Sequence, residues 1–209
     1  MQSLICYWAG RLDDSLRYAQ QATEVADPGG GTSAVWLIAN QARSLAALGR
    51  LAEAHAAIER AADAREYVEP DELDDLGGLC TFTRPRQLYY AADALRWGGR
   101  DEAESTERLA LLALDAYQQA PTADHAFGDE AGTRCALAAS RIELGEIAGA
   151  AEALAPVLDL PTPQRIHGVV SSVEYVHQVL IGIEKYAREA SELGEALREF
   201  STNRLALPQ

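Results

Sequence analysis

Apolar residues recur along the chain at the three- and four-residue spacing of an amphipathic helix. One stripe lies between Ala34 and Leu48 and consists of Val35, Ile38, Ala42 and Leu45. A second stripe starts at Leu51. Gly49 stands between the two, where a residue with left-handed backbone conformation commonly follows a helix. The pattern predicts a helical hairpin with a very short turn.

The same arrangement returns around other glycines. Gly10, Gly49, Gly98 and Gly145 follow one another at intervals of 39, 49 and 47 residues. Short side chains recur five positions after each glycine, twelve after it and, for the last three, seven before it. These residues are Ser15, Ala54, Ala103, Ala150; Ala22, Ala61, Ala110, Val157; and Ala42, Ala91, Ala138. Because interaxial distance follows the side chains at a helix contact, the offsets predict helix pairs that nest closely.

Segments rich in Gly, Pro and Asp separate the predicted pairs, and strand signals are nearly absent. We therefore expect an all-α fold and a single array over residues 1–209. The expected hairpins span approximately 1–26, 33–66, 84–119, 129–158 and 163–200, the first of them incomplete at its N-terminus. The segment 107–119 is apolar almost all round between Leu109 and Leu114, which predicts a helix buried on more than one side.

The turn glycine with short side chains at fixed offsets resembles the tetratricopeptide repeat, although the intervals exceed its usual length of about 34 residues. Three stretches resemble the C-terminal half of actinobacterial helix-turn-helix regulators of the lambda-repressor-like (XRE) class. They begin with GGLCTFTRPRQLYYAADALRWGG, HAFGDEAGTRCALAASRIELGE and LREFSTNRLALP. The resemblance covers most of the chain. It implies a right-handed superhelical solenoid of antiparallel helix pairs that senses a ligand or dimerises, and passes its state to a DNA-binding domain.

The sequence departs from that class because it contains no helix-turn-helix. Gly10 marks a turn, so the first helix of a normal repeat would begin before Met1. An apolar face at Ile5, Tyr7 and Trp8 would then lack its neighbour, and we expect a homodimer partner or a missing N-terminal domain to cover it. Three hypotheses stay open: the regulatory part of a transcriptional regulator, a stand-alone protein–protein adaptor and, most remotely, a metal-dependent enzyme.

Charge and composition narrow the classes of partner. The chain has 18 basic and 32 acidic residues, a net charge of −14. Because nucleic-acid binding draws on clustered positive charge, we expect no direct nucleic-acid binding by this chain. The three cysteines form no CxxC pair, so neither a disulfide framework nor a zinc site is predicted. No apolar run reaches the roughly 20 residues of a membrane span and no signal-peptide pattern is present, so we expect a cytoplasmic protein without membrane contact.

One face of each predicted first helix lies thirteen, nine, six and two positions before the turn glycine. In tetratricopeptide proteins this face lines the concave groove. It holds Trp36, Asn40 and Arg43 in one unit and Tyr89 and Arg96 in the next. Asn40 can hold a peptide backbone, the aromatic rings offer flat apolar contact, and the arginines can hold a carboxylate. We expect a peptide, small molecule or protein in this groove; the alternative is that Trp36 packs on the neighbouring repeat and the arginines are solvated.

His125 with its acidic neighbours Asp124, Asp129 and Glu130 is the only candidate for a metal or acid–base site. A cluster that caps the start of a helix explains the same residues, because acidic side chains favour the positive end of a helix. No second histidine lies at a useful helical spacing, and no phosphate loop, dinucleotide fingerprint or nucleophile elbow is present. We therefore predict no metal, no cofactor and no enzyme activity.

Overall fold

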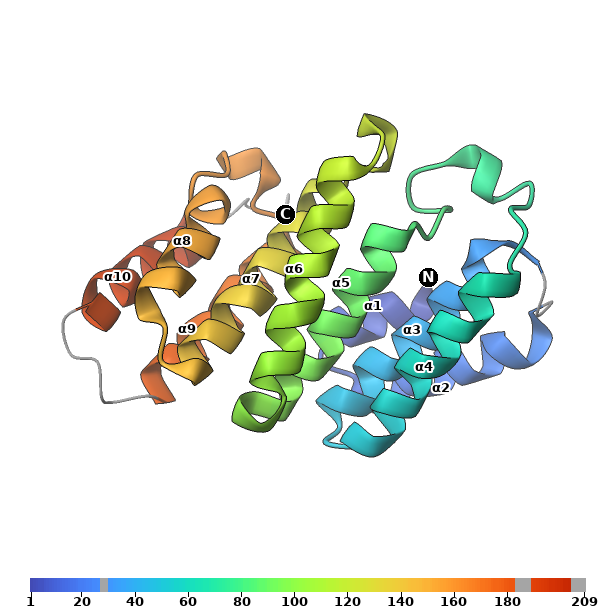
Figure 1. The fold of residues 1–209 in the computed structure, drawn as a ribbon, viewed down its shortest axis with the longest axis horizontal. Helices are drawn as coiled ribbons and strands as arrows, with labels where there is room; N and C mark the ends of the chain where they lie inside the picture. Colours follow the sequence, from blue (N-terminus) through green and yellow to red (C-terminus); the bar gives the residue numbers. More distant parts are fainter. Residues whose placement is uncertain (27–29, 183–188, 204–209) are drawn as a thin grey trace.

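The computed structural model describes residues 1–26, 30–182 and 189–203, and helices account for most of them (Figure 1). The α-helices are α1 Gln2–Trp8, α2 Leu12–Val25, α3 Gly31–Ala47, α4 Leu51–Tyr67, α5 Arg84–Leu95, α6 Ala103–Gln119, α7 Phe127–Leu144, α8 Ile147–Leu158, α9 His167–Gly182 and α10 Glu189–Thr202. Short 3₁₀ helices are η1 Asp74–Leu76, η2 Arg96–Glu102, η3 Thr122–Asp124 and η4 Thr162–Gln164. The described ranges hold no β-strand, only an isolated bridge between Gly30 and Glu69. The predicted all-α class is confirmed.

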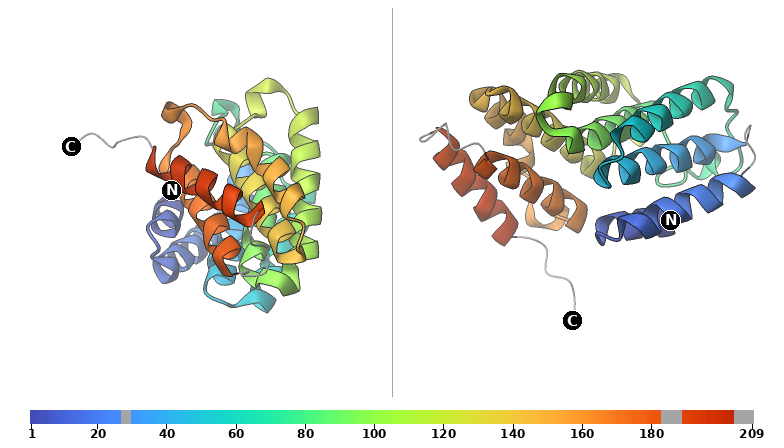
Figure 2. Two further views of the ribbon diagram at one scale, coloured as in Figure 1. Left: turned by 90° about the vertical axis from the view of Figure 1, so that its left-hand side faces the viewer. Right: turned by 90° about the horizontal axis from the view of Figure 1, so that it is seen from below.

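Consecutive helices pack against each other in a regular order. Each odd-numbered helix contacts the even-numbered helix that follows it and also the next odd-numbered helix. Helices α1 and α2 and helices α9 and α10 lie toward the same side of the molecule, as the right-hand view in Figure 2 shows. There α1 contacts α9, and His167 Nε2 donates a hydrogen bond to the Trp8 carbonyl oxygen at 3.1 Å. The inner face formed by the odd-numbered helices is therefore closed where the first and last of them meet.

The turn glycines explain the short hairpins. Gly10, Gly49 and Gly145 have φ angles of 71°, 77° and 89°, in the left-handed region that favours glycine. In each turn the glycine N–H bonds the carbonyl three residues back, and the next N–H bonds the carbonyl five residues back. The third hairpin differs from our expectation: η2 lies between α5 and α6, and the left-handed residue is Gly99, not Gly98.

The short side chains at the predicted offsets are buried. The four residues five positions after each glycine are 0–1% exposed, and of those twelve positions after, only Ala22 is partly exposed. In α6 the prediction of burial on more than one side holds only in part: the helix packs against both α5 and α7, but not all of its apolar residues are covered. Leu111 and Leu112 are 45% and 49% exposed, whereas Ala110 and Ala113 are fully buried. This helix lies on the outer face, so Leu111 and Leu112 face away from α5 and α7, while Leu109 and Leu114 pack against the core.

Two kinds of interior occupy the two halves of the molecule. The core around α7 to α10 is aliphatic, with fully buried residues that include Leu154, Val173, Val176 and Leu197. The core around α3 and α5 adds aromatic and charged groups to its alanines, among them Phe82, Tyr89, Tyr90, Arg43 and Asp93. No helix of the described residues is sufficiently long and apolar to span a bilayer.

Candidate ligand-binding site

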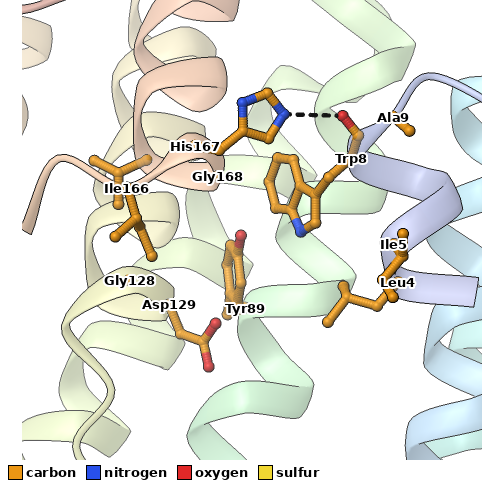
Figure 3. Close-up of a pocket in the computed structure, with 11 residues that line it drawn as sticks. Leu4, Ile5, Trp8, Ala9, Tyr89, Gly128, Asp129, Ile166, His167 and Gly168 are labelled. Atoms are coloured by element: carbon orange, nitrogen blue, oxygen red, sulfur yellow. Dashed lines mark hydrogen bonds between the residues drawn. The ribbon is translucent and has the colours of Figure 1, made fainter. Parts of the chain in front are cut away.

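A pocket of about 490 Å³ opens where α1 meets the N-terminal ends of α7 and α9 (Figure 3). We call it the α1–α9 pocket; its lining consists of Leu4, Ile5, Trp8, Ala9, Tyr89, Gly128, Asp129, Ile166, His167, Gly168 and Val169. Most of these side chains are apolar. In Figure 3 the Tyr89 hydroxyl points toward Trp8, and the Asp129 carboxylate lies at the opposite end of the tyrosine side chain. The pocket is thus an apolar cleft with a hydroxyl and a carboxylate in its wall.

Two glycines let side chains approach closely enough to shape this pocket. A Cβ at Gly132 of α7 would lie 2.4 Å from the Tyr89 hydroxyl oxygen, so the Tyr89 ring rests directly on the α7 backbone. A Cβ at Gly168 of α9 would lie 3.3 Å from Trp8 Cζ2. Both aromatic walls therefore depend on the absence of a side chain in the helix behind them.

The polar groups of the wall have defined states. Burial, together with the nearby Asp93 carboxylate, holds the pKa of Tyr89 well above its ordinary value, so the hydroxyl stays protonated. Burial also raises the pKa of Asp129, although the Arg86 guanidinium opposes this effect. Arg86 Nε donates to Asp129 Oδ2 at 2.8 Å, and Arg86 Nη1 bonds the carbonyl oxygen of Thr81. The Asp129 side chain remains 21% exposed.

A second pocket, of about 380 Å³, adjoins the first. Gly128, Asp129 and Ile166 line both pockets, so these residues separate two compartments of one groove. Leu79, Phe127, Thr83 and Arg86 are among the residues that line only the second.

Behind the pocket wall lies a buried ion cluster, which we call the arginine cluster: Arg43, Asp93 and Arg96. Arg43 Nε donates to Asp93 Oδ2 at 2.6 Å, and Arg96 Nε lies 2.8 Å from Asp93 Oδ1. These three side chains are only 1–4% exposed. Burial opposes ionisation of Asp93, but the two arginines outweigh it and hold its pKa below the ordinary value. The three charges are therefore retained inside the fold.

Aromatic rings enclose the arginine cluster. The Arg43 guanidinium lies 4.1 Å from the Tyr7 ring centre and 4.3 Å from that of Tyr90, and Arg96 lies 4.2 Å from that of Tyr175. Such cation–π contacts stabilise a buried cation that is not hydrated by water. Arg43 Nη1 and Nη2 are buried and have no hydrogen-bond partner among the described residues, so the rings are the main neighbours of these atoms.

The residues predicted to line a groove have different places in the structure. Of the five, only Tyr89 lines the α1–α9 pocket. Arg43 and Arg96 are neither solvated nor open to a ligand, because Asp93 already provides their carboxylate. Trp36 is half-buried, its ring stacks on Phe82, and its Nε1 donates to the Tyr90 hydroxyl at 3.2 Å. Asn40 is buried and its amide donates to the Trp36 carbonyl oxygen at 3.0 Å.

The face at Ile5, Tyr7 and Trp8 is covered in part by the chain itself. Tyr7 is buried over the arginine cluster and donates a hydrogen bond to Asp93 at 3.0 Å. Trp8 packs on Gly168, and Ile5, 57% exposed, lines the pocket. A homodimer partner or a further domain on this face stays a prediction.

The acidic cluster near His125 divides into two unrelated pairs. His125 Nδ1 lies 2.9 Å from Glu130 Oε1, whereas Asp129 pairs with Arg86. Within residues 1–26, 30–182 and 189–203, no three His, Cys, Asp or Glu side chains are grouped as a metal site requires.

Asp129, Ile166 and His167 line the pocket although the sequence pattern did not place them on a groove face, whereas Gly132, which lies behind Tyr89, does occupy such a position. Gly132 carried a usable signal, because it occupies a groove-face position inside an amphipathic helix, where glycine indicates a close approach. Ile166 and His167 follow a proline-containing loop and gave no signal.

These features define the class of the molecule: an all-helical protein of consecutively packed helix pairs with an apolar pocket between its first and last inner helices. No protein-family model matches the chain, and comparison with curated proteins and with solved structures gave no match.

Proposed function

We propose that this protein is a non-catalytic, TPR-like superhelical scaffold that binds a small ligand or a short apolar segment of a partner in the α1–α9 pocket. The observation that supports this function is the pocket itself. Its volume of about 490 Å³ lies within the range of roughly 300–1,000 Å³ for small-molecule sites. Its lining also has the composition of such sites, mostly apolar with a few polar groups.

The position of the pocket gives binding a mechanical consequence. Helix α1 supplies Leu4, Ile5 and Trp8 to the lining, and α9 supplies His167 and Gly168. A ligand in the pocket contacts both helices and so favours the arrangement in which they are joined. Binding energy that differs between joined and separated states shifts the balance between them.

This coupling fits the regulatory part of a transcriptional regulator. In the class that the sequence resembles, the array forms the C-terminal half, so a DNA-binding domain would precede α1. A ligand that fixes α1 against α9 would then be sensed next to that domain. The exposed Leu111 and Leu112 on α6 favour a second candidate, a stand-alone protein–protein adaptor, because they offer an apolar outer surface.

Filling the pocket tests the binding function. A Cβ at Gly128 would meet only Ile166 Cδ1, at 3.5 Å, so Gly128→Phe places a large side chain in the groove without a backbone clash. We expect ligands found by a thermal-shift screen of the wild type to lose their stabilising effect on this variant. Leu112→Phe, which adds a ring to the outer face, is the matched control and should keep that effect. Equal stabilisation of Gly128→Phe and wild type by every ligand would place binding elsewhere.

A further inference from the structure

The charge of the α1–α9 pocket comes from one carboxylate. Among its lining residues Asp129 is the only acidic residue, and no lysine or arginine is present. Arg86 donates to Oδ2, while no described residue donates a hydrogen bond to Oδ1. One oxygen of Asp129 is therefore available to a ligand.

The arginine cluster shows how this fold accommodates a second cation on one carboxylate. Asp93 holds Arg43 on Oδ2 and Arg96 on Oδ1, and the rings of Tyr7, Trp8, Trp97 and Tyr175 lie around the two guanidinium groups. Asp129 has one arginine on Oδ2 and lines a cavity whose walls include the rings of Trp8 and Tyr89. Compared with Asp93, the Asp129 site lacks the second cation.

We propose that a lipophilic cation, an amine or quaternary ammonium with an apolar body, occupies this place; the proposal rests on the binding function proposed above. Its charge lies against Asp129 Oδ1, the oxygen to which no described residue donates a hydrogen bond, and forms an ion pair with it. Its apolar body lies among Leu4, Ile5 and Ile166. The net charge of −14 adds a long-range attraction for cations.

Three probes of similar size test the sign of the charge: phenyltrimethylammonium, its uncharged isostere tert-butylbenzene, and benzoate. Dissociation constants are measured on the full chain by ligand-observed NMR. We expect the cation to bind wild type about tenfold more tightly than the isostere, and benzoate most weakly. Equal or tighter binding of the isostere or of benzoate would overturn the cation proposal, as would a failure of the cation to bind.

Two variants test whether Asp129 causes the preference for the cation over the uncharged isostere. Asp129→Asn should remove the tenfold preference while affinity for tert-butylbenzene changes by less than about twofold. Glu130→Gln, the next residue of α7, pairs with His125 outside the pocket and should retain the preference. A preference that persists in Asp129→Asn would refute the assignment. If Asp129→Asn does not fold, Ile166→Lys replaces it and should weaken binding of the cation more than of the isostere, because the added ammonium group competes for Asp129.

The measured affinities distinguish a failure of the cation proposal from a failure of the proposed binding function. If tert-butylbenzene binds as tightly as the cation and Gly128→Phe abolishes both, the pocket binds ligands without selecting charge. If Gly128→Phe changes no affinity, neither proposal holds.

Discussion

The inner core around α3 and α5 and the core around α7 to α10 achieve the same helix stacking with different chemistry. In the second, Leu154, Val173 and Leu197 are fully buried and their packing is non-directional. In the first, Asp93 forms ion pairs with Arg43 of α3 and Arg96 of η2 and accepts a hydrogen bond from Tyr7 of α1. Replacing such buried ion pairs by apolar residues is often neutral or stabilising, so net stability does not explain the arginine cluster.

The difference shows which contacts fix the position of α1. Tyr7 donates to Asp93 and accepts a hydrogen bond from Trp97 Nε1 at 3.1 Å, which fixes the position of α1. Helix α1 in turn carries Trp8 and Ile5 to the pocket. The charged half thus positions one wall of the α1–α9 pocket, whereas α9 of the aliphatic half supplies another.

The largest effect expected is for Asp93→Asn, which leaves two buried arginines without a counter-charge. We expect the free energy of unfolding, measured by urea denaturation at pH 7, to fall by about 3–5 kcal/mol. Leu154→Ala is the matched change in the aliphatic core and should lower it by about 2–5 kcal/mol through a cavity. A loss below about 1 kcal/mol for Asp93→Asn would mean that the arginine cluster is not maintained as described.

The stability losses of these two variants should depend differently on pH. Because the folded-state pKa of Asp93 is lowered, its ionisation stabilises the fold above its unfolded pKa of about 3.9, and this contribution is lost as the pH falls through the folded pKa. The stability gap between wild type and Asp93→Asn should therefore narrow as the pH falls below about 4. The gap for Leu154→Ala should not narrow in the same range.

A smaller loss is expected where the two halves meet, at Gly132. The methyl group of Gly132→Ala would overlap the Tyr89 ring, which is held between α5 and α7, so we expect a loss of about 1–3 kcal/mol in the free energy of unfolding. Gly128→Ala, four residues earlier on α7, makes only an ordinary contact with Ile166 and should be neutral or slightly stabilising. Equal stability of the two variants would show that Tyr89 does not rest on α7.

Local pattern was sufficient for the helical class and for burial of the short side chains. Ala54 and Ala150 are fully buried, as predicted. This burial was predictable because helical periodicity and the turn glycine both depend on residues that are close in sequence. The third hairpin shows the limit of this reasoning: Gly98 and Gly99 are adjacent, and the local pattern does not decide which becomes left-handed.

The site was less predictable because it depends on contacts distant in sequence. Arg43 meets Asp93 across 50 positions, and Trp8 meets His167 across 159. Helical spacing placed Arg43 and Tyr89 on α3 and α5, whereas Arg96 begins η2, and it gave no information about what faces these three residues. One signal was available: an acidic residue amid the apolar stretch LYYAADALRW, since a buried Asp is almost always paired.

The smallest effect should be the same in both halves, because it arises from a turn common to them. Gly49→Ala and Gly145→Ala each place a Cβ at a left-handed residue, and no atom lies within 4 Å of that Cβ at Gly49, so there the change tests the backbone alone. Left-handed strain of roughly 1–2 kcal/mol, partly offset by a less flexible unfolded chain, predicts a net loss of about 1 kcal/mol for each. Gly194→Ala, within α10 at ordinary contact distance from Leu180, should instead be stabilising. Urea denaturation of the three variants would contradict a shared turn if the losses at 49 and 145 differed by more than the effect itself.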